Sequence, residues 1–161
     1  MRIIGIDPGY DRLGIAVIEK PANGQRGKER LLYSDCFQTS PKEDIYSRLL
    51  QIGQEIGRVM DELDPEALSI ENLFITKNQK TAMRVAEARG IILYEAGRRG
   101  IPVAEYTPVQ IKAAVTGDGR SDKLMVAKMI CLLIDMSDKR ARLDDEYDAI
   151  AAALAHSATI R

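Results

Sequence analysis

Two acidic side chains end short apolar segments of the chain. Asp7 closes a β-branched segment and is followed by Pro8 and Gly9, and Glu71 closes the segment of residues 67–71. An ionised carboxylate at the end of a buried strand needs hydrogen bonds, a cation or a metal to compensate for its lost hydration. The simpler alternative is a turn in which Asp7 only caps Gly9, because Asp-Pro and Pro-Gly are ordinary turn pairs.

A second acidic group begins the last predicted helix, at Asp144, Asp145, Glu146 and Asp148. Acidic side chains stabilise helix N-termini by about 0.3–1 kcal/mol each, which would explain one or two of them. Residues three apart share a helix face, so Asp145 and Asp148 can point together into a cleft. Asp144 lies four residues before Asp148, and spacing alone does not exclude it. If the two acidic strand ends lie side by side, their carboxylates could meet this helix face.

Such a group of four carboxylates would repel itself, and divalent cations with oxygen ligands would relieve the repulsion. Mg²⁺ fits best because the group contains no His or Cys. Two such ions roughly 3.5–4 Å apart would activate water and stabilise the leaving oxygen at a phosphodiester. The chemistry indicated is therefore metal-dependent phosphodiester hydrolysis.

The segments that must position these carboxylates show two hydrophobic periods, one typical of strands and one of amphipathic helices. We expect the first three strands to form an antiparallel meander, in which the polar connection of residues 21–30 joins the second strand to the third. The whole chain, residues 1–161, is expected to form a single α/β domain. We expect strands at residues 2–7, 13–20, 31–39, 67–71 and 101–106. We expect five helices: residues 45–63, residues 81–99, a short helix from Pro108 to near Gly117, a helix that begins after a cap at Ser121, and residues 144–157.

Composition favours an ordinary globular domain. The 161 residues are 45% hydrophobic and contain no apolar segment of membrane-spanning length, so we expect a cytoplasmic protein without a membrane partner. Cys36 and Cys131 are isolated and are predicted to be buried, reduced thiols. The net charge of −1 conceals an uneven distribution, with −5 over residues 43–66 and +5 over residues 77–140. One face could therefore receive a polyanion.

The helix at residues 81–99 carries small residues at four-residue steps, namely Ala82, Ala86 and Gly90. Small residues at this spacing allow a close approach to a neighbour. The neighbour could be the sheet, the long first helix or a second copy of the protein.

At this point the chain resembles the RuvC family of bacterial Holliday junction endonucleases. The resemblance covers nearly the whole chain and rests on residues 5–9 (GIDPG), 70–74 (IENLF), 88–90 (ARG) and 145–149 (DEYDA). It implies an RNase H-like fold with a five-stranded mixed sheet flanked by helices. It also implies hydrolysis with two Mg²⁺ ions per active site, for which Mn²⁺ could substitute. A homodimer would nick two strands of a four-way DNA junction symmetrically, in a complex with a branch-migration helicase.

The resemblance also implies roles for individual residues. The four matching carboxylates, which would be both catalytic and metal-binding, are Asp7, Glu71, Asp145 and Asp148. Phe74 would stack on a junction base, which contributes about 1–3 kcal/mol, and Lys112 and Lys123 would hold the scissile phosphate or the junction strands. Further candidates for phosphate binding are Lys77, Lys80, Arg84 and Arg120. The helix with Ala82, Ala86, Arg89 and Gly90 would form the dimer interface. His156 is expected to be structural or exposed.

Three alternatives remain from the residues. An actin-like ATPase or sugar kinase would use Asp7-Pro8-Gly9 as a phosphate loop, but 161 residues leave little room for its second subdomain. An RNase H-like nuclease for RNA, such as a YqgF-family protein, would share the first motif, while the Phe74 segment and the Ala82 helix favour RuvC. The complete set of carboxylates argues against a junction-binding protein without catalysis.

Overall fold

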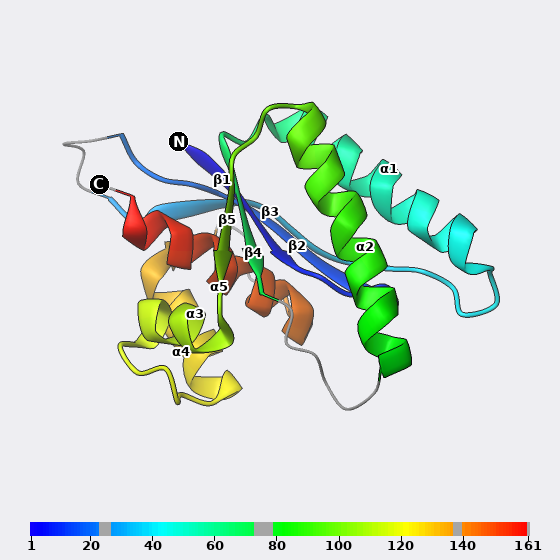
Figure 1. The fold of residues 1–161 in the computed structure, drawn as a ribbon. Coiled ribbons are helices and arrows are strands. Elements are labelled where there is room, and N and C mark those ends of the chain that lie inside the picture. Colours follow the sequence, from blue (N-terminus) through cyan, green and yellow to red (C-terminus); the bar gives the residue numbers. More distant parts are fainter. Residues whose placement is uncertain (23–26, 73–78, 137–139, 161) are drawn as a thin grey trace.

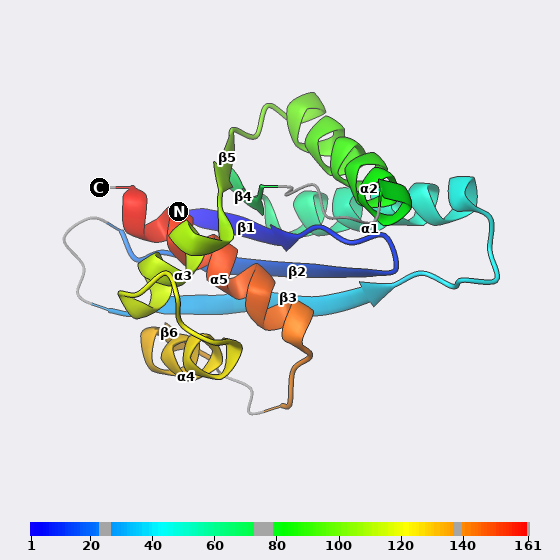
Figure 2. The same cartoon turned by 60° about the horizontal axis from the view of Figure 1, so that its bottom comes forward.

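A mixed β-sheet forms the centre of the computed structural model, which describes residues 1–22, 27–72, 79–136 and 140–160. In these residues the strand order is β5-β4-β1-β2-β3-β6 (Figures 1 and 2). β2 is antiparallel to both β1 and β3, while the β1–β4, β4–β5 and β3–β6 pairs are parallel. The strands are β1 (Arg2–Asp7), β2 (Arg12–Glu19), β3 (Glu29–Gln38), β4 (Ala67–Glu71), β5 (Val103–Tyr106) and β6 (Ile134–Asp135).

The predicted α/β fold and its antiparallel first three strands are confirmed, but the described sheet has a sixth strand. β6 comprises two residues that pair with Glu29 and Arg30 at the start of β3. A strand this short has no alternation of its own, and it directly follows the apolar helix that ends at Leu133. Periodicity therefore could not separate it from that helix.

Helices cover both faces of the sheet, as Figures 1 and 2 show from two directions. Alternation along β1 sends Ile4 and Ile6 toward one pair of helices and Ile3 toward the other group. The first pair is α1 (Ile45–Leu63) and α2 (Gln79–Arg98), and the other group is α3 (Pro108–Thr116), α4 (Lys123–Leu133) and α5 (Asp144–Thr159).

Helix α5 crosses the sheet in direct backbone contact because the strands beneath it carry glycine. A Cβ atom on Gly5 would lie 2.1 Å from the carbonyl oxygen of Ala149, and one on Gly14 would lie 2.0 Å from that of Asp145. The helix presents buried alanines to the sheet, and Ser69 donates a hydrogen bond of 2.6 Å to the Ala152 carbonyl. The sequence thus fixes the start of α5 directly over β2.

The predicted helix ends follow local capping. Pro65 follows α1, whose C-cap Asp64 adopts a left-handed conformation with φ 45°. Thr107 and Gln110 form the predicted capping box at the start of α3. The α4 cap was predicted at Ser121, but Asp122 takes this role, with its side chain accepting from the Met125 amide. Both residues are good N-caps, so residue type alone could not choose between them.

The prediction for the two cysteines is correct for Cys36 and wrong for Cys131. Cys36 is buried in β3, whereas Cys131 is exposed on α4. Only Val126 and Ile130 of α4 are fully buried, so a residue that looked apolar in the sequence lies on the outer face of a short helix. No helix in the described part of the chain is long and apolar enough to cross a membrane.

Candidate active site

The ends of two neighbouring strands bring Asp7 and Glu71 to one edge of the sheet. β1 and β4 run parallel, and Ile6 pairs with Ile70 one residue before each carboxylate. Carboxyl ends of parallel neighbours lie at the same edge. The two side chains therefore lie close together.

The first turn of α5 supplies the other two predicted carboxylates. Gly14 pairs with Asp7 across the sheet and also lies against the backbone of Asp145, so the start of α5 sits over the end of β1. Asp145 and Asp148 are partly buried, with side-chain exposures of 21% and 32%, while that of Asp144 is 77%. Asp144, which spacing had left open, points to solvent.

The electrostatics show that these four carboxylates act on one another. Burial, followed by the charges of Asp148, Glu71 and Asp145, raises the pKa of Asp7 to about 7, against the opposing charge of Lys123. Burial and then Asp148 also raise the pKa of Glu71. The other three carboxylates therefore lie within electrostatic reach of Asp7.

Two predicted lysines and one unpredicted arginine face this carboxylate cluster. Lys123 Nζ lies 3.0 Å from Asp148, and the charges of Lys112 and Lys123 both oppose the rise in the pKa of Glu71. The Arg12 guanidinium forms an ion pair with Asp145. Arg12 had no sequence signal of its own, because its partner lies 133 residues away along the chain. The Cys36 thiol is also 3.6 Å from the Asp145 carboxylate.

The cluster offers only oxygen ligands of the type that Mg²⁺ prefers. Burial and then the neighbouring negative charges raise the pKa of Asp7, and a divalent cation would relieve the repulsion between these charges. In the described residues no three His, Cys, Asp or Glu side chains converge closely enough to hold one ion. Two of the four carboxylates instead face Arg12 and Lys123. The donor chemistry fits a hard divalent cation, provided that these side chains turn toward it.

A buried arginine, Arg48, holds the turn that connects Asp7 at the end of β1 to Arg12 at the start of β2. Arg48 of α1 donates hydrogen bonds to Thr39 Oγ1 at 2.8 Å and to the Tyr10 carbonyl at 3.2 Å. It also forms an ion pair with Asp11 and lies 4.4 Å from the centre of the Tyr10 ring. Arg48 was not predicted, because an arginine on an amphipathic helix usually lies in solvent.

Glu146 is a buried carboxylate beside the cluster but forms part of a separate network. It accepts hydrogen bonds from Ser34 Oγ at 2.8 Å, from Arg140 at 3.1 Å and from the Leu143 amide at 3.2 Å. These bonds tie the start of α5 to β3. They match the ordinary role of an acidic residue at a helix N-terminus.

The other predicted DNA-binding residues are scattered. Phe74 and Lys77 lie outside the described residues, and Lys80 belongs to the first turn of α2. Arg84 is paired with Glu87 at 2.8 Å on the same helix. Arg120 is exposed in the loop between α3 and α4, 3.7 Å from Asp118.

Part of the small-residue face of α2 is left uncovered by the other described residues, while Ala82 is half-buried. Ala86 and Gly90 are exposed, and a Cβ atom on Gly90 would meet nothing within 4 Å. The opposite face, with Ala88 and Ile92, is the buried one. Arg89 is an exception in the predicted interface, because its guanidinium is 2.7 Å from Glu105 of β5 and only 15% exposed.

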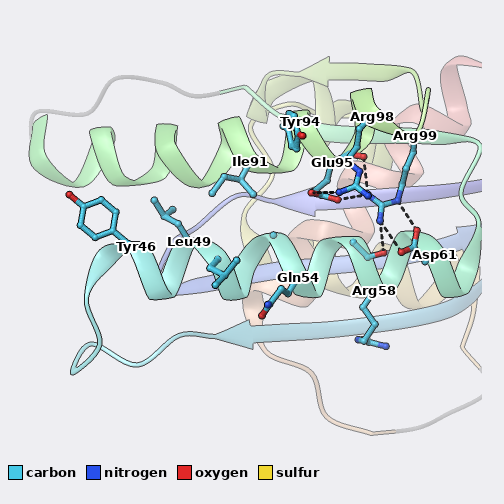
Figure 3. Close-up of a pocket in the computed structure, with 13 residues that line it drawn as sticks. Tyr46, Leu49, Gln54, Arg58, Asp61, Ile91, Tyr94, Glu95, Arg98 and Arg99 are labelled. Carbon is cyan, nitrogen blue, oxygen red and sulfur yellow. Dashed lines mark hydrogen bonds and ion pairs between the residues drawn. The ribbon is translucent and has the colours of Figure 1, made fainter.

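An open groove runs between α1 and α2 beside this face (Figure 3). At one end Tyr46 and Leu49 present apolar surface, and Tyr46 is 81% exposed. At the other end Arg99 bridges the two helices through Asp61 at 2.8 Å. The groove therefore combines a closed, charged end with an uncovered apolar end.

His156 lies away from the carboxylate cluster, in the last turn of α5. Its Nδ1 atom is 2.8 Å from the Tyr106 hydroxyl, and burial lowers its pKa. It has the structural role that was expected.

Comparison with known proteins gives a consistent result over nearly the whole chain. The family profile described as Crossover junction endodeoxyribonuclease RuvC matches residues 3–156. A protein of that name from Moorella thermoacetica is 43% identical over 98% of this chain and 91% of its own length. One from Thermosipho melanesiensis is 44% identical, over 95% and 94%. The structure of Thermus thermophilus RuvC in complex with Holliday junction substrate superimposes with a TM-score of 0.88 at 33% identity, over 98% and 93% of the two chains.

Proposed function

Because the chain belongs to the RuvC family of crossover junction endodeoxyribonucleases, we propose that its carboxylate cluster cleaves four-way DNA junctions by phosphodiester hydrolysis. The observation that carries this proposal is that the charges of three carboxylates, Glu71, Asp145 and Asp148, all act on Asp7. They belong to a chain that matches, over nearly its full length, a protein whose structure was solved with a Holliday junction.

The cluster would act with divalent cations. Asp7, Glu71, Asp145 and Asp148 would hold two Mg²⁺ ions, for which Mn²⁺ could substitute, and such ions supply an activated water and stabilise the leaving oxygen. Carboxylates bind cations in their ionised form. Since the pKa of Asp7 is raised to about 7 in the absence of a cation, protons and cations would compete for this carboxylate up to about neutral pH.

The basic residues around the cluster would hold the DNA. The charges of Lys112 and Lys123 both act on Glu71, and we propose that both lysines contact a phosphate bound at the site. Lys77, Lys80, Arg84 and Arg120 would contact the phosphates of the junction arms, and Phe74 would stack on a base near the branch point. Phosphate contacts of this kind make affinity depend on salt.

A homodimer would place two such sites on one junction and so give paired nicks. The outward face of α2, with Ala82, Ala86 and Gly90, would contact the partner, together with the apolar end of the groove between α1 and α2. Arg89 would hold α2 against β5 through Glu105 and thereby keep this face in place. We extend the proposal to a complex with a branch-migration helicase, which would move the junction past the dimer.

The proposal is tested on a synthetic four-way junction, a linear duplex and an RNA–DNA hybrid, each with Mg²⁺ or EDTA. We expect paired nicks in the junction with Mg²⁺ and none with EDTA. Asp7→Asn should abolish the nicks, whereas Asp144→Asn, which changes a neighbouring but solvent-facing carboxylate, should retain them. Cleavage of the hybrid instead of the junction would favour the RNA nuclease, and activity surviving in Asp7→Asn would contradict the proposed site.

A further inference from the structure

The ion pair between Arg12 and Asp145 joins the start of β2 to the first turn of α5. Both members are partly open to water, with side-chain exposures of 47% and 21%. The backbone around them is fixed, because Gly14 lies against the Asp145 carbonyl. The guanidinium is therefore held beside the carboxylate by the fold, while its own side chain has room to move away.

The same Asp145 oxygen contacts both the Arg12 guanidinium and the Cys36 thiol. A carboxylate oxygen that already accepts these contacts is less available to a metal ion. A fixed positive charge next to a ligand also repels an arriving cation. Arg12 thus opposes cation binding both by occupying the ligand and by its charge.

Charge balance gives Arg12 a second effect on the metal-free cluster. Asp7 lies within electrostatic reach of Glu71, Asp145 and Asp148, and Glu71 lies within reach of Asp148. Such a group destabilises the fold unless positive charge compensates it. Arg12 provides part of that compensation from the sheet side, and Lys123 provides another part from α4.

We propose that Arg12 is an internal counterion that competes with divalent cations for Asp145 and so sets the cation concentration at which the site becomes competent. This inference rests on the proposed function only in taking Asp145 as a metal ligand. The pairing keeps the cluster folded without metal, and a divalent cation must displace the guanidinium to bind.

The test is a titration of the DNA-free protein with Mn²⁺, in which free Mn²⁺ is followed by its paramagnetic resonance signal. Arg12→Gln removes the charge and should bind Mn²⁺ about two- to fivefold more tightly than the wild type, a range typical of losing one partly exposed ion-pair partner. Arg12→Lys keeps the charge and should bind close to the wild-type value. Arg30→Gln is a matched control, since Arg30 forms an exposed pair with Glu19 at 2.9 Å away from the cluster.

Thermal unfolding of the same variants gives an independent measurement. Without Mn²⁺, Arg12→Gln should unfold at a lower temperature than the wild type, and the stabilisation gained on adding Mn²⁺ should be larger. Equal or weaker Mn²⁺ binding by Arg12→Gln, or the same shift in Arg30→Gln, would overturn the proposal. A protein that binds Mn²⁺ with the expected shift but leaves junctions uncut would refute the proposed substrate and keep the role of Arg12.

Discussion

Two carboxylates near the start of α5, the buried Glu146 and the half-buried Asp7, have opposite electrostatic surroundings. Burial alone would raise the pKa of Glu146, but hydrogen bonds from Arg140 and Ser34 outweigh it and lower the pKa. At Asp7, burial and the neighbouring carboxylates act in the same direction and raise the pKa to about 7. Glu146 is paired with partners that fix the backbone, whereas Asp7 lies among like charges. The difference separates a carboxylate that stabilises the fold from one that lies under electrostatic stress, as the proposed catalytic role of Asp7 would require.

The largest effect should follow from neutralising Asp7. In Asp7→Asn the cluster loses its central negative charge, so junction cleavage should fall by about a thousandfold or more, equivalent to several kcal/mol of transition-state stabilisation. The folded protein should be at least as stable as the wild type, because repulsion is relieved. Cleavage kinetics and denaturant unfolding measure the two effects. If Asp7→Asn loses activity because it unfolds, Asp7 stabilises the fold as Glu146 does.

The converse change is Glu146→Ala, which removes the acceptor for the hydrogen bonds from Ser34, Arg140 and the Leu143 amide. Its free energy of unfolding should drop by about 1–3 kcal/mol, because the donors lose a buried partner. Urea unfolding measures the loss, and Glu146→Gln should recover part of it by keeping the shape and some acceptors. Mn²⁺ binding should persist in Glu146→Gln. If that variant instead kept full stability and lost the metal, Glu146 would belong to the cluster.

The four carboxylates could be predicted because each stands at a position that sequence marks clearly. Asp7 and Glu71 end apolar strands, and Asp145 and Asp148 are three apart at a helix start. The family's motifs then selected these residues from the other acidic ones. The α/β fold followed from the alternation of strand and helix periods in the same way.

The partners of these carboxylates could not be predicted, because their contacts join distant parts of the chain. Arg12 reaches Asp145, Arg48 on α1 reaches the turn after Asp7, and Ser34 reaches Glu146. None of these pairs leaves a periodic pattern, and any Arg or Ser is compatible with a solvated surface. Tertiary packing, which brings α5 onto Gly5 and Gly14, decides them.

The pH dependence of stability should have opposite signs for the two carboxylates. Asp7 has a folded pKa near 7 against an ordinary value of 3.8, so its contribution is fully present below pH 3.8 and is lost as pH rises toward 7. In EDTA, the wild type should therefore lose on the order of 2 kcal/mol relative to Asp7→Asn across this window, given partial exposure of the site. The ionised Glu146 contributes to the free energy of unfolding above pH 4.5, and this contribution disappears as pH falls through its lowered pKa. Urea unfolding at several pH values measures both contributions. If the free energy of unfolding changes with pH in the same way in the wild type and in Asp7→Asn, the prediction for Asp7 is contradicted.

The smallest effect concerns Lys123, which partly compensates the cluster as Arg140 compensates Glu146. Its charge lowers the pKa of both Asp7 and Glu71. In Lys123→Gln both values should rise, so the acid limb of the pH–activity profile should move to higher pH by less than about one unit, a change of under tenfold in rate at fixed pH. Lys128→Gln, on the same helix but not among the charges that act on these carboxylates, is the matched control. A uniform loss of rate at every pH in Lys123→Gln would mean that Lys123 acts through DNA contact alone. The contrast between the pKa values of Asp7 and Glu146 would then come from burial and the neighbouring carboxylates, without a contribution from Lys123 on α4.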